Sequence, residues 1–277
     1  MMRLKILAIL QPELDSIFND FYEQLMSHPT FSVYFPDRTK IKPLIEKQKA
    51  YFRDSFEDNY ETLKEKYIAL GEMHYQMKLP FVDFSSGLDI LQEKTIHAVY
   101  RSHQSENILD ATFVFFRLIR AYTAKGYLNK ILAQDTEDID IYLEKVSKSK
   151  ETQNAIAIDR LLWLKNFIYA IQKENKALAP SFFIEPEIIA NIQTSLRQKE
   201  SFMNYIRDMI SRIRIDASNV FFFLEKKDYS DVLPLYRELL SIYKLSLMLT
   251  NVITIANNDV IIQDLSKDSL TNLLNRS

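Results

Sequence analysis

The sequence predicts an all-α protein, and three observations lead to this fold class. Apolar residues recur at spacings of three and four along most of the chain, whereas the sustained alternation typical of strands is missing. Only three of the 277 residues are glycine, far below the usual share of roughly 7%. Good helix formers such as Leu, Lys and Glu are abundant. Together these features favour helices joined by short connections.

The first part of the chain divides into several predicted helices. An apolar stripe at helical spacing predicts an early helix, at Leu14, Ile17, Phe18, Phe21 and Leu25. Breaks or first turns of helices are marked by Pro29, Pro36, Pro43 and Pro80. A polar connector is expected at 102–107, and an apolar helical stripe resumes at Phe113, Phe116 and Ile119.

A second domain is predicted after a polar hinge at 145–151. Beyond it we expect helices around 154–176, 186–197, 199–225 and 230–265, which are enough for a four-helix bundle. The domain limits are therefore placed at 1–147, 148–265 and 266–277.

The last predicted helix carries a heptad-like seam. The seam consists of Leu235, Leu239, Ile242, Ser246, Leu249, Ile253, Ala256 and Val260, spaced alternately by four and three. One interpretation is the core stripe of a helix within its own bundle. The other is a dimer stalk that transmits movement to a segment beyond residue 277. The sequence leaves both open.

Composition removes several classes of function. The chain has 35 Lys and Arg against 37 Asp and Glu, so no basic surplus indicates binding to nucleic acid or to an anionic membrane. The absence of cysteine excludes disulfides, thiolate catalysis and cysteine-bound metal centres. The three glycines do not cluster, so no glycine-rich loop for nucleotide phosphates is expected.

Targeting signals are not expected either. The opening MMRLKILAIL is followed by Gln-Pro-Glu without a small-residue cleavage site, so it predicts a helix and not a signal peptide. The apolar stretch Leu245–Ile262 is interrupted by polar residues and is too polar for a membrane span. We expect a cytoplasmic protein with no membrane partner.

His74 has the setting best suited to a cofactor. Tyr67, Leu70, Gly71 and His74 share one helical face, and the missing side chain of Gly71 is expected to leave room for a flat group. A single imidazole is able to ligate haem iron and leave the opposite face open for a gas. The alternative is a core histidine satisfied by a backbone carbonyl, and the local sequence decides for neither.

The other histidines do not indicate a metal site. His28, His97 and His103 lack the paired one-turn spacing of a multi-ligand zinc or di-iron centre, so none is expected.

Aromatic and aliphatic residues of the first domain form a candidate pocket lining. They include Tyr22, Phe31, Tyr34, Phe35, Leu44, Ile45, Phe52 and Phe56. An apolar lining with a hydroxyl donor suits an apolar macrocycle and a polar diatomic ligand. An ordinary aromatic-rich helical core has the same composition.

Three pieces of residues 10–130 resemble the sensor globin of the globin-coupled sensor family. They are Asp20-Phe21-Tyr22-x-x-Leu25, the segment from Pro29 to Phe35, and Leu70-Gly71-x-x-His74 followed by Lys78-Leu79-Pro80.

This resemblance implies a haem b cofactor and a role for each candidate residue. His74 would be the proximal ligand of the iron, and Tyr22 would donate a hydrogen bond to bound oxygen. Phe35 would pack on the haem, and Ile45 or its neighbour Leu44 would occupy the distal aliphatic position that controls water access.

A second resemblance lies at the end of the chain. The segment Asp268-Ser269-Leu270-Thr271-Asn272-Leu273-Leu274-Asn275-Arg276 is similar to the element that opens GGDEF-type diguanylate cyclase domains. Residues 150–265 resemble the helical middle segment of oxygen-regulated diguanylate cyclases in order and helical character. The resemblance implies a catalytic body, with its GTP and Mg²⁺ sites, in the parent protein, so this chain is expected to lack cyclase activity.

Taken together, the resemblances imply a haem-based oxygen sensor and signal-transmission region of a diguanylate cyclase. They also imply a homodimer formed through the globin and linker helices. The rival hypothesis is a haem-free, globin-like signalling or dimerisation module in which His74 and Tyr22 are core residues. A free-standing enzyme is not expected, because candidate dyads such as Asp110 with His103 come without a nucleophile or an oxyanion-binding loop.

Overall fold

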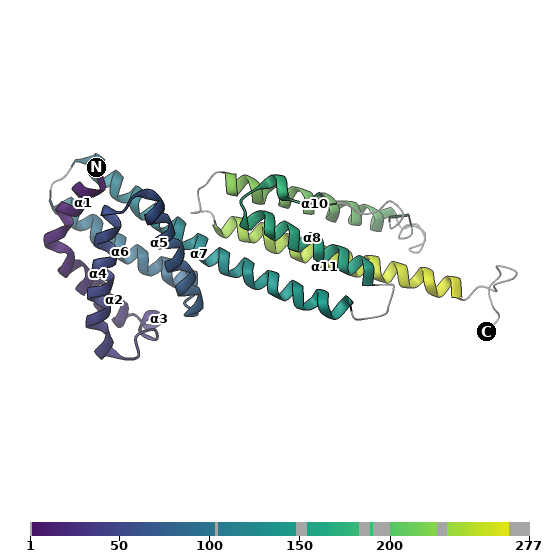
Figure 1. Ribbon diagram of the computed structural model, residues 1–277, viewed down its shortest axis with the longest axis horizontal. Helices are drawn as coiled ribbons and strands as arrows, with labels where there is room; N and C mark the ends of the chain where they lie inside the picture. Colours follow the sequence, from purple (N-terminus) through teal and green to yellow (C-terminus); the bar gives the residue numbers. More distant parts are fainter. Residues whose placement is uncertain are drawn as a thin grey trace. The chain divides into compact units, whose positions relative to one another are not determined.

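Every secondary-structure element in the described part of the chain is a helix (Figure 1). The computed structural model describes residues 2–102, 105–147, 154–182, 189–190, 200–225 and 232–265. The α-helices are α1 (Met2–Leu10), α2 (Leu14–Ser27), α3 (Pro29–Ser32), α4 (Ile41–Glu57), α5 (Tyr60–Gln76), α6 (Phe81–Arg101), α7 (Glu106–Ser147), α8 (Asn154–Gln172), α10 (Glu200–Glu225) and α11 (Val232–Leu265). Short 3₁₀ helices are η1 (Gln11–Glu13), η2 (Arg38–Lys40) and η3 (Lys176–Leu178). The all-α prediction is confirmed.

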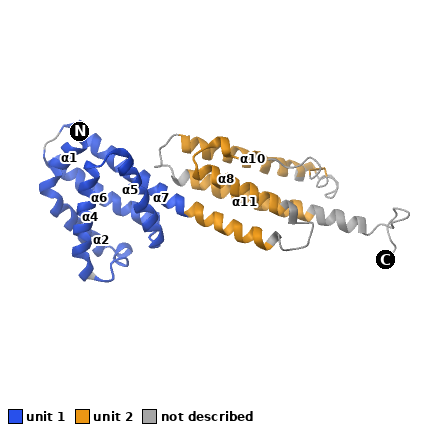
Figure 2. Cartoon of the chain, in the orientation of Figure 1, with its two compact units in different colours: residues 1–130 blue, residues 131–277 orange. Residues whose placement is uncertain are grey.

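The chain divides into two compact units, Met1–Lys130 and Ile131–Ser277 (Figure 2). α7 is one helix of 42 residues that contributes to both units. The domain limits derived from the sequence, 147/148 and 265/266, both border segments outside the described residues, and they stay predictions.

Local signals set the helix ends that matter for the candidate site. The Asn59 side chain accepts a hydrogen bond from the Thr62 amide at 3.0 Å and caps α5. After α5 ends, Lys78 adopts a left-handed backbone conformation with φ of 59°, and Pro80 precedes α6. The connector predicted at 102–107 separates α6 from α7, which begins at Glu106.

An aromatic core holds the first unit together. α2 packs against α4 and α6, and α1 packs against the same two helices. The buried rings of Phe56 and Phe115 stack with centroids 4.3 Å apart, and Phe52 meets Phe18 edge to face at 5.5 Å. Such contacts contribute about 0.5–1.5 kcal/mol per pair beyond the burial of apolar area. The core thereby fixes α2 and α4, the helices that carry the predicted distal residues.

The second unit is a helical bundle in which the end of α7 takes part. α10 packs along α11, and α8 contacts both helices. The Tyr243 hydroxyl of α11 donates to Asp135 of α7 at 2.9 Å, and Lys165 of α8 donates to Asp140 of α7 at 2.5 Å. The helix predicted at 186–197 lies mostly outside the described residues. Among the described residues, the end of α7 thus joins the bundle as a fourth helix through its contacts with α8 and α11.

The seam of α11 lies in the core of this bundle. Six of its positions are at most 2% exposed: Leu235, Leu239, Ile242, Ser246, Leu249 and Ile253. The side chains of Ala256 and Val260 lie outside the described residues. One chain thus buries these six positions by itself, which favours the bundle-core alternative there.

One segment of α11 also meets the length and composition criteria for a membrane span. This segment is Leu235–Ile255, and a third of its most apolar window is buried inside the protein. It begins ten residues before the stretch considered in the sequence analysis. A core helix of a bundle satisfies the same criteria.

Candidate functional site

One ring nitrogen of His74 has no hydrogen bond among the described residues. Its Nδ1 atom lies 2.8 Å from the carbonyl oxygen of Leu70, one turn earlier in α5. A carbonyl oxygen only accepts, so Nδ1 carries the proton and donates it, and the neutral ring keeps its lone pair on Nε2. Burial lowers the pKa of His74, and the Leu70 hydrogen bond opposes this shift in part. The ring is therefore held in the tautomer and charge state of a metal ligand.

Aromatic side chains of α6 and α7 pack around His74. The Phe84 ring lies 5.0 Å from the imidazole, centroid to centroid. Phe81 and Tyr127 meet edge to face at 5.2 Å, and the Tyr127 hydroxyl donates to the carbonyl of Leu79 at 2.9 Å. The connection between α5 and α6 is thus anchored to α7, which holds the end of α5 that carries His74 in place.

Gly71 does not serve the purpose expected from the sequence. A Cβ atom built on Gly71 would come within 2.1 Å of the carbonyl oxygen of Thr123 in α7. The absence of a side chain allows α5 to approach the α7 backbone closely, and the space is filled by protein. The expectation that Gly71 makes room for a flat group is wrong.

Tyr22 is a buried tyrosine with an unused hydroxyl. Its side chain on α2 is 4% exposed, and among the described residues none forms a hydrogen bond with it. Burial raises the pKa of Tyr22 well above its usual value, so the hydroxyl stays protonated at neutral pH. The protonated hydroxyl is therefore available to donate a hydrogen bond to a polar ligand.

The other predicted residues belong to the same apolar cluster as Tyr22. Phe35, which follows α3, meets the Tyr22 ring edge to face with centroids 5.8 Å apart. Leu44 and Ile45, on α4, are partly buried against this cluster, as are Leu70 and Phe84 next to His74. All four residues therefore belong to the core of the first unit, Phe35 contacts Tyr22 directly, and the same core includes Leu70 and Phe84.

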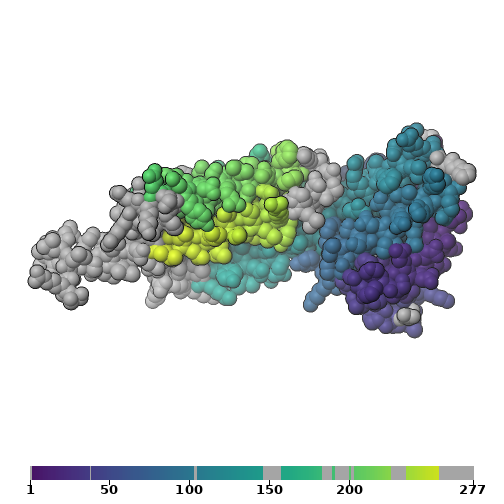
Figure 3. Space-filling model, turned by 180° about the vertical axis from the view of Figure 1, so that it is seen from behind, coloured from purple at the N-terminus to yellow at the C-terminus, as the bar shows by residue number. Residues whose placement is uncertain are grey.

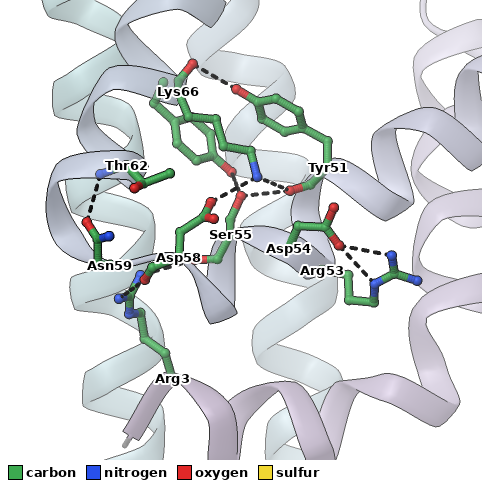
Figure 4. Close-up of polar contacts among 10 residues, drawn as sticks. Arg3, Tyr51, Arg53, Asp54, Ser55, Asp58, Asn59, Thr62 and Lys66 are labelled. Carbon is green, nitrogen blue, oxygen red and sulfur yellow. Dashed lines mark hydrogen bonds and ion pairs between the residues drawn. The ribbon is translucent and has the colours of Figure 1, made fainter.

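Polar contacts lock the junction between α4 and α5 (Figure 4). The Lys66 ammonium donates to Asp58 and to the carbonyl of Tyr51, both at 3.0 Å, and lies 4.3 Å from the Tyr51 ring centroid. The Tyr51 hydroxyl donates to the carbonyl of Lys66 at 2.8 Å. α4 carries Leu44 and Ile45, and α5 carries His74. These contacts therefore fix the position of the predicted distal residues relative to the helix that carries His74.

The same junction is tied to the first helix. Arg3 of α1 donates to the carbonyls of Ser55 (3.1 Å) and Asp58, at the end of α4. The Ser55 hydroxyl donates to the carbonyl of Tyr51 at 2.7 Å, so it accepts from Tyr67 at 3.1 Å. Arg3 thereby supplies a partner for the Ser55 carbonyl in the last turn of α4 and for the Asp58 carbonyl directly after it.

The arrangement fits haem. A neutral imidazole with a free Nε2 is a ligand for iron, the apolar cluster suits a macrocycle, and the unpaired Tyr22 hydroxyl is a donor for a polar ligand. A scan against protein-family models matched the Protoglobin model over residues 4–170, more than half of the chain. The chain belongs to the protoglobin family.

This protoglobin is a globin-based gas sensor, and its family membership implies haem binding. The match begins in α1 and ends in α8, so it extends beyond the first compact unit. A comparison with curated proteins gave no match, and neither did one with solved structures. Protoglobins bind diatomic gases and commonly dimerise.

Sequence reasoning missed three contributors to this protoglobin site. Phe84 contacts His74, Tyr127 anchors the α5–α6 corner, and Asp83 receives a hydrogen bond from Tyr34. The Phe81 and Phe84 pair, three residues apart after Pro80, was a signal for the first of these. The other two depend on contacts across 48 and 49 residues, for which one sequence offers no signal.

Proposed function

We propose that this protoglobin is the oxygen-sensing and signal-transmitting region of a diguanylate cyclase, with haem b as its cofactor. The observation that carries the sensing part is the buried side chain of Tyr22, whose protonated hydroxyl has no hydrogen bond among the described residues, in a core cluster that includes the neighbours of His74. When bound, haem supplies an iron that takes up diatomic gases.

The residues of the chain then have separate tasks in this proposal. His74 offers Nε2 as the proximal ligand, oriented by the hydrogen bond from Nδ1 to Leu70. Tyr22 donates a hydrogen bond to a gas ligand that carries partial negative charge, which favours oxygen over carbon monoxide. Phe35, Leu44 and Ile45 keep water away from the ligand side of the pocket.

The transmission part of the proposal rests on α7 and on the end of the chain. α7 begins in the globin unit and ends in the second unit, so a displacement along its axis reaches Asp135 and Asp140, which contact α11 and α8. The diguanylate cyclase part is supported by the element at 268–276, which lies outside the described residues. Gas binding would control cyclic di-GMP synthesis from GTP only if the two signalling states bind the gas with different affinity.

We also propose a homodimer that uses the globin and linker helices. In the globin unit, Tyr100 at the end of α6 and Phe113 early in α7 are exposed apolar side chains. The outer face of α11 exposes Leu240, Leu247 and Ile255, which recur at two-turn spacing, and Figure 3 shows this helix at the surface beside α10. This face of α11 is free for a second copy, whereas its seam is used within the chain.

The test is an absorption spectrum of the purified chain after haem reconstitution, in the reduced, oxygenated and carbon-monoxide-bound forms. We expect a Soret band that shifts with each ligand, and no stable haem complex in His74→Ala unless imidazole is added. His97→Ala is the matched control, because His97 is exposed on α6. A wild-type chain without stoichiometric haem uptake would contradict the proposal and leave a haem-free signalling module.

A further inference from the structure

A hydrogen bond joins two distant segments beside the candidate site. The hydroxyl of Tyr34, just after α3, donates to Oδ2 of Asp83, in the first turn of α6, at 2.7 Å. The acceptor is a carboxylate, so the bond is charge-assisted. The pKa of Tyr34 is raised because its proton is held by Asp83.

Each partner is the chain neighbour of a residue that lines one side of the site. Phe35 follows Tyr34 and meets the Tyr22 ring at 5.8 Å. Phe84 follows Asp83 and lies 5.0 Å from the His74 ring. The Tyr34–Asp83 bond thus connects the segment that packs on the proposed distal donor with the segment that packs on the proposed proximal ligand.

The surroundings of this bond are exposed and apolar. Val33, Met77 and Val82 are 68%, 66% and 67% exposed, and they lie next to Tyr34, at the end of α5 and next to Asp83, respectively. The bond itself is solvent-exposed, and so are Val33 and Val82, the chain neighbours of its two partners.

A second hydrogen bond, independent of the Tyr34–Asp83 bond, anchors the connection between α5 and α6. Tyr127 donates to the carbonyl of Leu79 from α7, so that part of the corner stays anchored when the outer bond breaks. Breaking the Tyr34–Asp83 bond would therefore release the segment after α3 while His74 keeps its position.

We propose that the Tyr34–Asp83 hydrogen bond is a strap at the edge of the candidate haem site, which opens to admit haem and closes to retain it. The inference rests on the proposed function, since it assigns haem to this site. The strap acts on the rate at which haem is lost and leaves the ligand-binding chemistry of His74 and Tyr22 unchanged.

The experiment measures haem transfer from the reconstituted full chain to an excess of a haem-scavenging apoglobin. Tyr34→Phe and Asp83→Asn should each increase the rate of haem loss by about three- to tenfold, the range for one hydrogen bond of modest net strength. The double variant should lose haem no faster than either single variant, because both remove the same bond. The Soret spectrum should match the wild type.

Matched controls make the same chemical changes away from the strap. Tyr142→Phe alters an exposed tyrosine late in α7, and Asp110→Asn alters an exposed carboxylate early in α7. Both should keep the wild-type rate of haem loss. Equal rates for Tyr34→Phe, Asp83→Asn and these controls would overturn the strap while leaving the gas-sensor proposal intact. A wild-type chain that binds no haem would overturn both.

A second readout uses the haem-free chain. Hydrogen exchange of the amides at 33–37 should accelerate in Tyr34→Phe and Asp83→Asn, while exchange within α5 stays unchanged. If the variants instead destabilise the fold in general, exchange should accelerate throughout the first unit. That outcome would mean that the Tyr34–Asp83 bond only stabilises the fold, and it would overturn the strap.

Discussion

Gly71 of α5 and Gly126 of α7 lie against each other's helix backbone. A Cβ on Gly71 would come within 2.1 Å of the Thr123 carbonyl oxygen, and a Cβ on Gly126 would come within 2.1 Å of the Ile68 carbonyl oxygen. The helix that carries His74 is therefore packed on α7 at a distance that only glycine allows. Movement of His74 along α5 has a direct mechanical path to α7, the helix that continues into the second unit.

Replacement of Gly71 by alanine should therefore destabilise the first unit. The obstructing atoms belong to backbone, so the two helices must separate, and we expect a loss of about 3 kcal/mol or more. Gly87→Ala is the control, because its Cβ would meet only the Leu25 side chain, at 3.9 Å, and alanine favours a helix by about 1 kcal/mol. Urea unfolding followed by circular dichroism measures both, and equal midpoints would refute the close-packing argument.

Tyr22→Phe should separate gas affinity from stability. The Tyr22 hydroxyl has no partner among the described residues, so its removal should leave the haem-free chain as stable as the wild type or slightly more stable. Oxygen release from the reconstituted chain should accelerate by about 10-fold or more, as expected for a charge-assisted bond of 1.5–3 kcal/mol. Unchanged oxygen release in flow experiments would remove Tyr22 from its proposed role.

Tyr67→Phe is the control for the stability and oxygen-release measurements on Tyr22→Phe. Tyr67 is buried and its hydroxyl bonds to Ser55 at 3.1 Å, so the variant should lose about 1 kcal/mol of stability. Its oxygen release should remain that of the wild type, because Tyr67 belongs to the α4–α5 lock.

His74 should make the stability of the haem-free chain depend on pH. Burial lowers its folded-state pKa below the ordinary 6.5, so just under pH 6.5 the unfolded chain binds more protons than the folded chain. The contribution of His74 to stability is thus present above pH 6.5 and is lost as the pH falls through the folded pKa. His74→Gln should flatten the unfolding free energy in this window, and an imidazole titration by NMR should give a pKa below 6.5. A titration at or above 6.5 would contradict the prediction.

The seam of α11 gives a prediction for the second unit. Leu249 is fully buried, so Leu249→Asp places a charge in the bundle core and should cost more than about 3 kcal/mol. Leu247→Asp, at a position that is 64% exposed, should change stability by no more than about 0.5 kcal/mol. If α11 dimerises through its outer face, sedimentation should show the weaker dimer for Leu247→Asp. If the second unit of Leu249→Asp stays folded, and if this variant loses the dimer while Leu247→Asp keeps it, the stalk interpretation would be restored.

Much of the fold could be predicted because it depends on local patterns. The stripe from Leu14 to Leu25 became α2, and the connector at 102–107 separates α6 from α7. The part that the end of α7 takes in the second unit was not predicted, because the polar segment at 145–151 indicates where a helix ends and gives no sign of where its preceding turns pack.

The candidate site was predictable as a set of residue types and not as a geometry. His74 and Tyr22 were proposed from their motifs, and Phe35, Leu44 and Ile45 from the apolar lining and the resemblance to sensor globins. The tautomer of His74 depends on a hydrogen bond to Leu70 that the sequence does not show. The pairing of Tyr34 with Asp83 depends on contact between residues 49 positions apart. The function of Gly71 was misjudged for the same reason, since its neighbour is 52 positions away in α7.

The sequence by itself therefore determined the all-α fold class and the chemical types at the candidate site, because hydrophobic period and motif spacing act over a few residues. The tertiary structure decided which side of α11 is core, what fills the space beside Gly71, and which polar groups find partners. These outcomes follow from packing and desolvation, which depend on contacts between residues that are distant in the chain and close in space.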